Sequence, residues 1–448
     1  MPSAEPQVTG WRQTFGSLHG NRDFSVLFAG NIMFFFGMNT MIILRSWLVI
    51  KEWDDVALLG YLMATVALPM LLLAPIGGVI ADRIDRRKLV LVAQSFLVVT
   101  NSVVAVLIIT DTIEYWHLLI VSPLTAASFA LNMPARQAMV AMLVPREKLL
   151  NAMALSTAAM NGSRILGPPL AGLFIVTMGI GPAYVISTIF YAVAAIMMAA
   201  LPALKTEREG DFTFFEDFVE GISYMRRTPL VLGLLLFSTV PMVFAMPYQV
   251  LLPVFADRVW DVGSVGFGVI QGVGGVGGLL GALYVANLDN YPKKGKVLLI
   301  GALGFGGALI LFALSPWFYV ALIFMAIVGF ASMVVMTVNN TAIQLIIPDQ
   351  VRGRVASVMM MSFGLMPLGA VPASVVAESM GAPIVVAFGG VMFIISVVLI
   401  FAFLPAFRTI DRDLEESRTQ EAARQAGERL SKDAARSAPR AVPAIGPG

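Results

Sequence analysis

Long apolar stretches alternate with short polar stretches along most of the chain. Most apolar stretches approach or exceed the roughly 20 residues that an α-helix needs to cross the hydrocarbon core of a bilayer. The pattern predicts a transmembrane helix at each of 24–50, 57–80, 89–110, 116–143, 151–177, 180–203, 230–256, 265–288, 297–314, 317–346, 354–377 and 382–404. We therefore expect an all-α polytopic membrane protein with twelve transmembrane helices.

The longest polar stretch before the C-terminal tail divides these segments into six and six. It predicts two six-helix bundles, at 24–204 and 230–404, joined by a central linker at 205–229. The linker is either an amphipathic helix at the membrane surface or a plain connection. A polar N-terminus at 1–23 precedes the bundles, and a partly disordered tail at 405–448 follows them.

A weak internal repeat supports this division into halves. Residues 137–147 and 340–350 lie 203 positions apart, each at the end of the fourth span of its half. Two halves with the same topology are parallel repeats, an arrangement found in transporters.

Basic residues fall almost entirely on one side of this topology. Of the 30 Lys and Arg residues, 25 lie on the side that holds both termini, and two, Lys51 and Arg258, lie on the other. The remaining three are inside or at the edges of spans. Because short loops rich in Lys and Arg stay in the cytoplasm, we expect both termini to be cytoplasmic.

The composition narrows the chemistry further. Hydrophobic residues make up 58% of the chain, above the roughly 45–50% of soluble domains. The chain has no Cys and only two His, so we expect no cofactor and no metal site. No catalytic constellation and no nucleic-acid-binding patch is present, so neither an enzyme nor a nucleic-acid partner is expected.

One polar stretch, residues 78–88, stands out because six of its eleven residues are charged and apolar segments flank it. The pattern G-x-x-x-D-[RK]-x-G-x-[RK]-[RK] is matched by Gly78, Asp82, Arg83, Arg87 and Lys88, with Asp85 in place of the second glycine. This is the signature loop of the major facilitator superfamily, which the chain resembles over residues 24–404. The resemblance implies a fold of two six-helix bundles and secondary transport.

A narrower resemblance is to the bacterial branch that contains the enterobactin exporter, the transmembrane secretion effectors and the macrolide-efflux proteins. It is carried by residues 21–24, 134–138, 143–147, 151–152, 167–172 and 220–227. Gly167, Pro168 and Gly172 are similar to the fifth-helix motif of exporters, although Ser163 and Ala171 replace two of its glycines. The resemblance implies close helix packing at this motif.

The resemblance also implies a gate. By analogy with the family, Asp82 faces the cytoplasmic start of the eleventh helix, so Gly78, Asp82 and Arg83 are expected to form a cytoplasmic latch. Arg87 belongs to the same loop and is expected mainly to set topology. Arg136, near the cytoplasmic end of the fourth span, is expected to be a gate residue.

An arginine inside a membrane span is energetically costly. Such residues usually line a substrate or ion pathway or form an ion pair with another charged side chain. Arg164 is expected to bind an anionic or catecholate-like cargo, to pair with a carboxylate of the other half, or to extend to the interface. Arg45 either contacts cargo or extends outward. Other polar side chains that could line a central cavity are Asn31, Asn39, Gln249, Gln271, Asn339 and Asn340.

Energy coupling is the least determined feature. No Asp or Glu lies in the middle of a predicted span; Glu378, near the outer end of the eleventh, is either a proton carrier or a loop carboxylate. Proton coupling therefore rests on the resemblance. No Walker A sequence is present, and the glycine-rich run 272–278 lies inside an apolar span, where it predicts helix packing.

These features predict a monomeric exporter of amphiphilic small molecules, drug-like or siderophore-like, in the bacterial inner membrane. Its expected partners are the substrate, the lipid bilayer and, by resemblance, protons. An importer of a small metabolite and a non-transporting membrane sensor are the alternatives.

Overall fold

A computed structural model describes residues 17–18, 20–204, 228–288, 294–347, 363–403 and 411 of the chain. The side chains of 74–83, 229 and 363 are not described. The predicted central linker and almost all of the predicted tail therefore lie outside the described residues.

The first half forms six long helices, because its apolar stretches bury their backbone polar groups only in helical form. They are α2 (Arg22–Trp53), α3 (Ala57–Arg83), α4 (Arg86–Ile109), α5 (Tyr115–Leu143), α6 (Leu149–Met178) and α7 (Ile180–Ala199).

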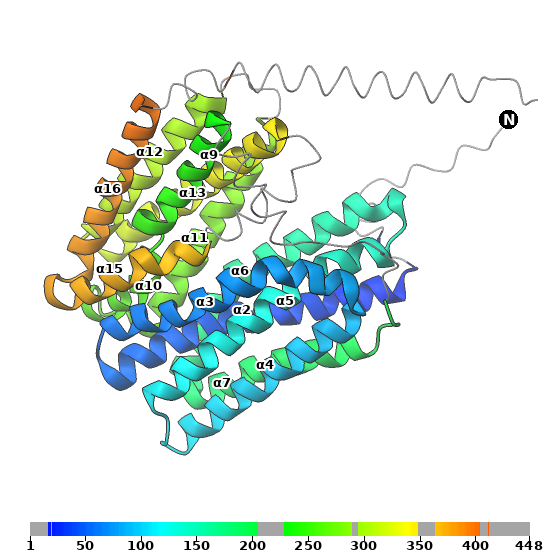
Figure 1. The fold of residues 1–448 in the computed structure, drawn as a ribbon. Coiled ribbons are helices and arrows are strands. Elements are labelled where there is room, and N and C mark those ends of the chain that lie inside the picture. Colours follow the sequence, from blue (N-terminus) through cyan, green and yellow to red (C-terminus); the bar gives the residue numbers. More distant parts are fainter. Residues whose placement is uncertain are drawn as a thin grey trace, which may run out of the picture.

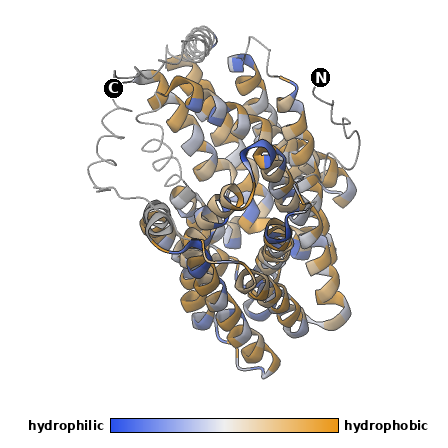
Figure 2. Ribbon diagram, turned by 90° about the vertical axis from the view of Figure 1, so that its right-hand side faces the viewer, coloured by the Kyte–Doolittle hydropathy of each residue, from blue (hydrophilic) through white to orange (hydrophobic). Residues whose placement is uncertain are grey.

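The second half also supplies six spans. The first is a run of four pieces, α9 (Pro229–Val240), η2 (Pro241–Ala245), α10 (Tyr248–Val254) and η3 (Phe255–Val259), of which η2 and η3 are π-helical. The others are α11 (Gly263–Ala286), α12 (Lys294–Ala313), α13 (Phe318–Ile346), η4 with α15 (Phe363–Leu365, Met366–Met380) and α16 (Ala382–Phe403). The predicted all-α fold with twelve spans is thus confirmed, and the helices are apolar along most of their length (Figure 2).

The two six-helix bundles lie at an angle to each other (Figure 1). We call the side on which α2 begins and α16 ends the terminal side, and the side on which α2 ends and α3 begins the distal side. The bundles meet where α6 packs on α11 and α3 packs on α15, and their terminal-side ends diverge (Figure 1).

The loop between α3 and α4 explains how Asp85 replaces the glycine of the signature pattern. Asp85 has φ −49°, which any residue adopts, and its side chain accepts a hydrogen bond from the Lys88 backbone N–H at 3.2 Å. Asp85 therefore caps the start of α4, a position that favours aspartate. The departure from the pattern has a structural reason.

Arg87 acts within the first half. Its guanidinium donates to the carbonyl oxygens of Met198 (3.3 Å) and Ala199 (2.5 Å) at the end of α7. A cation at a helix C-terminus stabilises the unpaired carbonyls there. Among the described contacts, Arg87 thus joins α4 to α7, and none of its contacts crosses between the halves.

Candidate functional site

The interface between α6 and α11 is built from glycines and prolines. Pro168 and Pro169 have no N–H, so the carbonyl oxygens one turn before them are left without their usual helical partners. Glycines of α11 allow the backbones to touch: a Cβ at Gly268 would lie 2.3 Å from the Pro168 carbonyl oxygen, and one at Gly172 would lie 2.3 Å from that of Ser264. The Ser264 hydroxyl also donates to the Gly172 carbonyl at 3.1 Å.

The predicted packing motif therefore lies at a contact between the halves. Gly172 and Pro168 face α11, whereas Gly167 faces α2 of its own half, where a Cβ would meet the Asn39 side chain at 2.8 Å. Not all glycines of α11 serve this contact. Gly274 and Gly281 instead face Met325 and Phe330 of α13 in the second half.

A second contact between the halves joins α3 to α15 near the distal side. A Cβ at Gly60 would lie 2.8 Å from the Cβ of Ser374, which is fully buried. Farther along α3, Leu71 lies against Gly364 of η4.

An aromatic pair makes a third contact between the halves. Trp47 of α2 stacks on Phe267 of α11, with ring centroids 6.1 Å apart and an interplanar angle of 22°. Both side chains are buried. The two rings come from different halves, so they form an apolar layer across the molecule.

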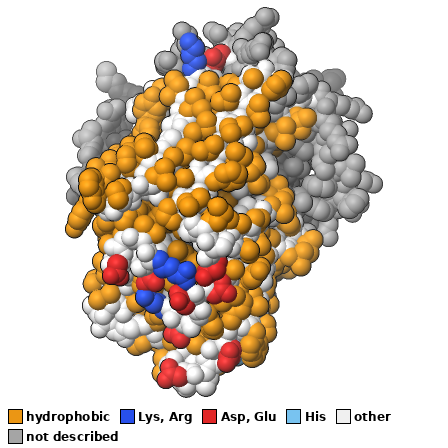
Figure 3. Space-filling view, turned by 90° about the vertical axis from the view of Figure 1, so that its left-hand side faces the viewer, with side chains coloured by type: hydrophobic (Ala, Val, Ile, Leu, Met, Phe, Trp, Pro, Cys, Tyr) orange, Lys and Arg blue, Asp and Glu red, His pale blue; other side chains and the backbone are white. Residues whose placement is uncertain are grey.

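Charged side chains lie beyond this layer, on the distal side, and we call Lys51, Asp54, Asp257, Arg258 and Glu378 the distal latch. Lys51 Nζ lies 2.5 Å from Asp257 Oδ1. Arg258 donates to the Asp54 side chain and to its backbone carbonyl, both at 2.7 Å. Figure 3 shows acidic and basic side chains gathered in one patch on an otherwise largely apolar face.

Glu378 completes the latch from α15. Its Oε2 lies 3.5 Å from an Arg258 nitrogen and accepts a hydrogen bond from the Val56 backbone N–H at 2.8 Å. Arg258 and Glu378 belong to the second half, and Asp54 and Val56 belong to the turn between α2 and α3. The latch thus ties three spans together across the interface.

The latch was not predicted as a unit. From the sequence, Lys51 and Arg258 are the two distal cations, and Glu378 is either a proton carrier or a loop carboxylate. The signal available in the sequence was that the two distal cations, Lys51 and Arg258, lie at the same level as several carboxylates. The pairing itself joins residues 204 and 322 positions apart, so the sequence order does not reveal it.

Arg136 is a correction to the sequence-based prediction of a gate. It is 2% exposed inside the first half, and it donates to Asn132 Oδ1 and Asn31 Oδ1, each at 2.5 Å, and to the Gln94 side-chain oxygen. Its guanidinium also lies 4.2 Å from the Phe34 ring centroid. The contacts join α2, α4 and α5 within one bundle, so Arg136 holds that bundle together and does not lie between the halves.

Arg45 is half-buried on α2. Its terminal nitrogens lie 3.2 Å from Ser122 Oγ and 3.4 Å from Thr125 Oγ1 of α5, while its Nε is buried without a hydrogen-bond partner. The hydroxyl of the buried Tyr184 is a further polar neighbour of the Arg45 guanidinium. Arg45 therefore points into the first half and does not extend to the distal surface.

Arg164 lies deep in the membrane region and is exposed in the structure. It follows the first residue of α6, Leu149, by 15 positions (164 − 149), which is roughly 22 Å at 1.5 Å per residue. It also lies within electrostatic range of Tyr248 in α10 of the other half. The prediction that Arg164 extends to the nearby interface does not fit this depth.

The remaining predicted cavity residues are dispersed. Asn31 belongs to the Arg136 network, Asn39 donates to the Phe35 carbonyl of its own helix, and Asn339 donates to Ser238 Oγ at 2.5 Å. Gln249, Gln271 and Asn340 are partly exposed. The side chains of Asp82 and Arg83 are not described, and of residue 78 only the backbone is. The predicted cytoplasmic latch therefore remains a prediction.

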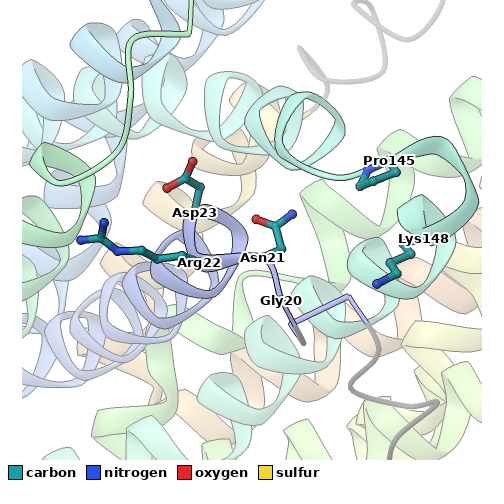
Figure 4. Close-up of a pocket in the computed structure, with 6 residues that line it drawn as sticks. All are labelled: Gly20, Asn21, Arg22, Asp23, Pro145 and Lys148. Carbon is teal, nitrogen blue, oxygen red and sulfur yellow. The ribbon is translucent and has the colours of Figure 1, made fainter.

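A cavity of about 490 Å³ lies on the terminal side of the first half (Figure 4). It is lined by Gly20, Asn21, Arg22, Asp23, Pro145 and Lys148. Asn21 caps α2 by accepting from the Phe24 N–H at 3.0 Å, and it donates to the Leu143 carbonyl at 2.6 Å. The Asn-Arg-Asp-Phe stretch thus fastens α2 to the end of α5, which gives it a structural role.

Comparisons with known proteins agree with this architecture. Solved structures that share it include a POT family transporter in complex with 5-aminolevulinic acid, with a TM-score of 0.71, 13% identity and coverage of 86% of this chain and 97% of that chain. A nucleoside transporter matches with a TM-score of 0.67, 12% identity and coverage of 87% and 100%. These likenesses show the fold.

The sequence relatives are more specific. The chain is 26% identical to the staphyloferrin A transporter of Staphylococcus aureus (strain NCTC 8325 / PS 47), over 88% of this chain and 96% of the relative. It is also 26% identical to the macrolide efflux protein A of Streptococcus pyogenes (72% and 80% covered) and to an enterobactin exporter of Shigella boydii (62% and 67% covered). A family model described as transmembrane secretion effector matches residues 14–431. The chain therefore belongs to the transmembrane secretion effector family of major facilitator transporters.

Proposed function

We propose that this transporter is an exporter that moves amphiphilic small molecules, drug-like or siderophore-like, out of a bacterial cell by alternating access. One observation supports the direction of transport, and a second supports the orientation in the membrane. Relatives at 26% identity are described as an exporter and as an efflux protein. The terminal side holds 25 of the 30 basic residues, which favours a cytoplasmic terminal side in the inner membrane.

The observation that carries the mechanism is the contrast between the two sides. On the distal side, ion pairs, an aromatic layer and backbone contacts join the halves, whereas the terminal-side ends of the bundles diverge (Figure 1). In a protein of two rocking halves, this is the state that receives cargo from the terminal side. Release outward then requires the distal latch to break.

The strength of the latch suits that role. Partly exposed ion pairs contribute about 0.2–1 kcal/mol each, and charge-assisted hydrogen bonds about 1.5–3 kcal/mol. A latch of a few such contacts shifts a two-state equilibrium strongly and is still reversible. Because one chain supplies both sides of the latch, we expect the monomer to be the working unit.

The latch is also where we propose that protons act. Asp54, Asp257 and Glu378 are the carboxylates that join the halves among the described residues. Protonation of these groups removes their ion pairs with Lys51 and Arg258 and so favours opening of the distal side. Proton influx drives export only if the same protons then leave on the terminal side.

Cell accumulation tests the export proposal. A panel of dyes, antibiotics and siderophores is measured in cells that express the wild type, Asp82→Asn or no transporter. We expect wild-type cells to accumulate less of at least one compound, and Asp82→Asn to restore its level. Higher accumulation with the wild type would favour the importer, and equal accumulation across the panel would contradict transport of these classes.

A further inference from the structure

The direction of the Arg164 side chain follows from its neighbours on α6. Gly167 faces α2 and Gly172 faces α11. At about 100° per residue, Arg164 leaves the helix about 60° from Gly167 and about 80° from Gly172, in the sector of about 140° between them. Leu166 and Leu173, which are 55% and 46% exposed, lie on the opposite side of the helix. Arg164 therefore points toward the centre of the molecule, and the leucines point toward lipid.

The first half carries positive charge that no described carboxylate neutralises. Arg45, Arg136 and Arg164 all lie inside its spans, and among the described residues none of them forms an ion pair. The described spans of the second half carry charged side chains only near their ends: Asp257, Arg258, Lys294, Lys296 and Glu378. An unpaired guanidinium in the membrane is costly, and the cost is recovered when an anion binds.

Arg136 has three amide oxygens as acceptors, but the other two guanidinium groups are less well satisfied. Arg45 has two hydroxyl neighbours and a buried Nε without a partner. Arg164 is exposed, and its depth of roughly 22 Å along α6 places it near the bilayer centre, far from lipid phosphates. An anion that reaches Arg164 therefore arrives through the space between the halves.

The two groups lie at different depths. Gly167 and Asn39 mark one level, because they touch. Arg164 lies three residues before Gly167 on α6, and Arg45 lies six residues beyond Asn39 on α2, which separates them by roughly 13 Å along the bundle at 1.5 Å per residue. Arg164 is thus met first from the terminal side, and Arg45 lies closer to the distal latch.

We propose that the transported molecule is an organic anion, and that Arg164 binds its carboxylate or sulfonate group, with Arg45 the next guanidinium on the way to the distal side. The proposal names the substrate class of the proposed exporter. That the bound anion is also transported rests on the export proposal. A planar guanidinium binds such a group through two parallel hydrogen bonds, which a neutral analogue of the same shape does not provide. The second half closes over the anion and contributes no charge of its own at this depth.

A pair of matched dyes tests the proposal. 1-Anilino-8-naphthalenesulfonate is an anion, and N-phenyl-1-naphthylamine is the same ring system without the sulfonate. Fluorescence titration of the purified full-length protein gives the dissociation constant of each dye for the wild type, Arg164→Gln, Arg164→Lys and the control Arg146→Gln. Arg146 is an exposed cation on the terminal side, outside the spans.

We expect Arg164→Gln to weaken sulfonate binding about tenfold, the loss of one charge-assisted pair, and to change binding of the neutral dye less than twofold. Arg164→Lys keeps part of the affinity, Arg146→Gln keeps all of it, and added salt weakens only the anion. Equal effects of Arg164→Gln on both dyes, no effect on either, or wild-type protein that does not bind the sulfonate saturably would overturn the anion site.

Uptake into inverted membrane vesicles separates this proposal from export itself. Vesicles with wild-type protein should accumulate the sulfonate dye, and vesicles with Arg164→Gln should not. If no dye is accumulated while the binding difference persists, the anion site stands and export of this anion fails. If both dyes are accumulated equally by the wild type and by Arg164→Gln, export stands and the anion site fails.

Discussion

The two halves share a topology but differ in what they hold inside. The first half contains three arginines within its spans and an amide network around Arg136. The interior of the second half, in its described part, is made of glycine contacts between α11 and α13 and of aromatic pairs such as Phe305 with Phe393. The difference indicates a division of labour, in which the first half recognises cargo and the second moves against it.

The largest expected effect breaks the network of the first half. Arg136→Met leaves the oxygens of Asn31, Asn132 and Gln94 without donors, and buried unpaired acceptors cost about 1–3 kcal/mol each. We expect a loss of roughly 2–5 kcal/mol, seen as a lower thermal unfolding temperature of the purified protein. The matched change in the second half, Asn339→Ala, removes one bond to Ser238 and should cost about 1 kcal/mol. Equal destabilisation would contradict the asymmetry.

The next effect concerns the close contact between α6 and α11, where the two halves meet. Gly268→Ala places a methyl group 2.3 Å from the Pro168 carbonyl oxygen if nothing moves, so α6 and α11 must separate. Overpacking of this kind costs about 1–3 kcal/mol, and we expect transport to fall more than stability. Gly304→Ala is the control, because nothing lies within 4 Å of its Cβ position. Unchanged transport with Gly268→Ala would show that the close approach is dispensable.

A smaller effect follows from opening the distal latch. Arg258→Gln removes the ion pair to the Asp54 carboxylate and the hydrogen bond to the Asp54 carbonyl across the interface, worth about 1–2 kcal/mol together, and should raise the outward-open population roughly five- to thirtyfold. The reporter is Ser264→Cys, since Ser264 is 2% exposed and the chain has no Cys of its own. An impermeant maleimide added from the distal side should label it faster. An unchanged rate would mean that the latch does not hold this side shut.

The smallest effect is expected from Lys51→Gln. Lys51 is 46% exposed and pairs with Asp257 alone among the described residues, so the change should cost about 0.2–1 kcal/mol. Labelling of Ser264→Cys should then rise less than about fivefold. A larger rise than with Arg258→Gln would reverse the ranking of the two latch contacts.

The twelve helices were predictable from sequence because each one needs a long apolar run, and their ends moved by only a few residues in most cases. The helix run 229–259 was predicted as one span at 230–256, and its two π-helical turns were not predicted, although Pro241, Pro247 and Pro253 lie at or beside them and interrupt helical hydrogen bonding. The sequence showed that arginines inside the spans need a polar partner. It did not show their roles, because Arg136 donates hydrogen bonds to Asn31 and Gln94 of two other helices.

At Arg164, the sequence did not reveal toward which neighbouring helices the side chain points. The sequence showed Gly167 and Gly172, but not that one faces α2 and the other α11. The distal latch was hidden for a similar reason, since Arg258 and Asp54 meet only after the halves assemble. Single-helix features could thus be predicted, and features that depend on how helices pair could not.

The most direct test of the account is a disulfide across the distal contact. Gly60→Cys with Ser374→Cys joins α3 to α15 at positions whose Cβ atoms would lie 2.8 Å apart, close enough for a bond after a small shift. The background contains no other Cys. Transport of 1-anilino-8-naphthalenesulfonate into inverted vesicles is measured before and after oxidation. The account predicts that oxidation abolishes transport, that reduction restores it, and that binding of the anion persists in both states; transport that continues with the halves locked together would contradict it.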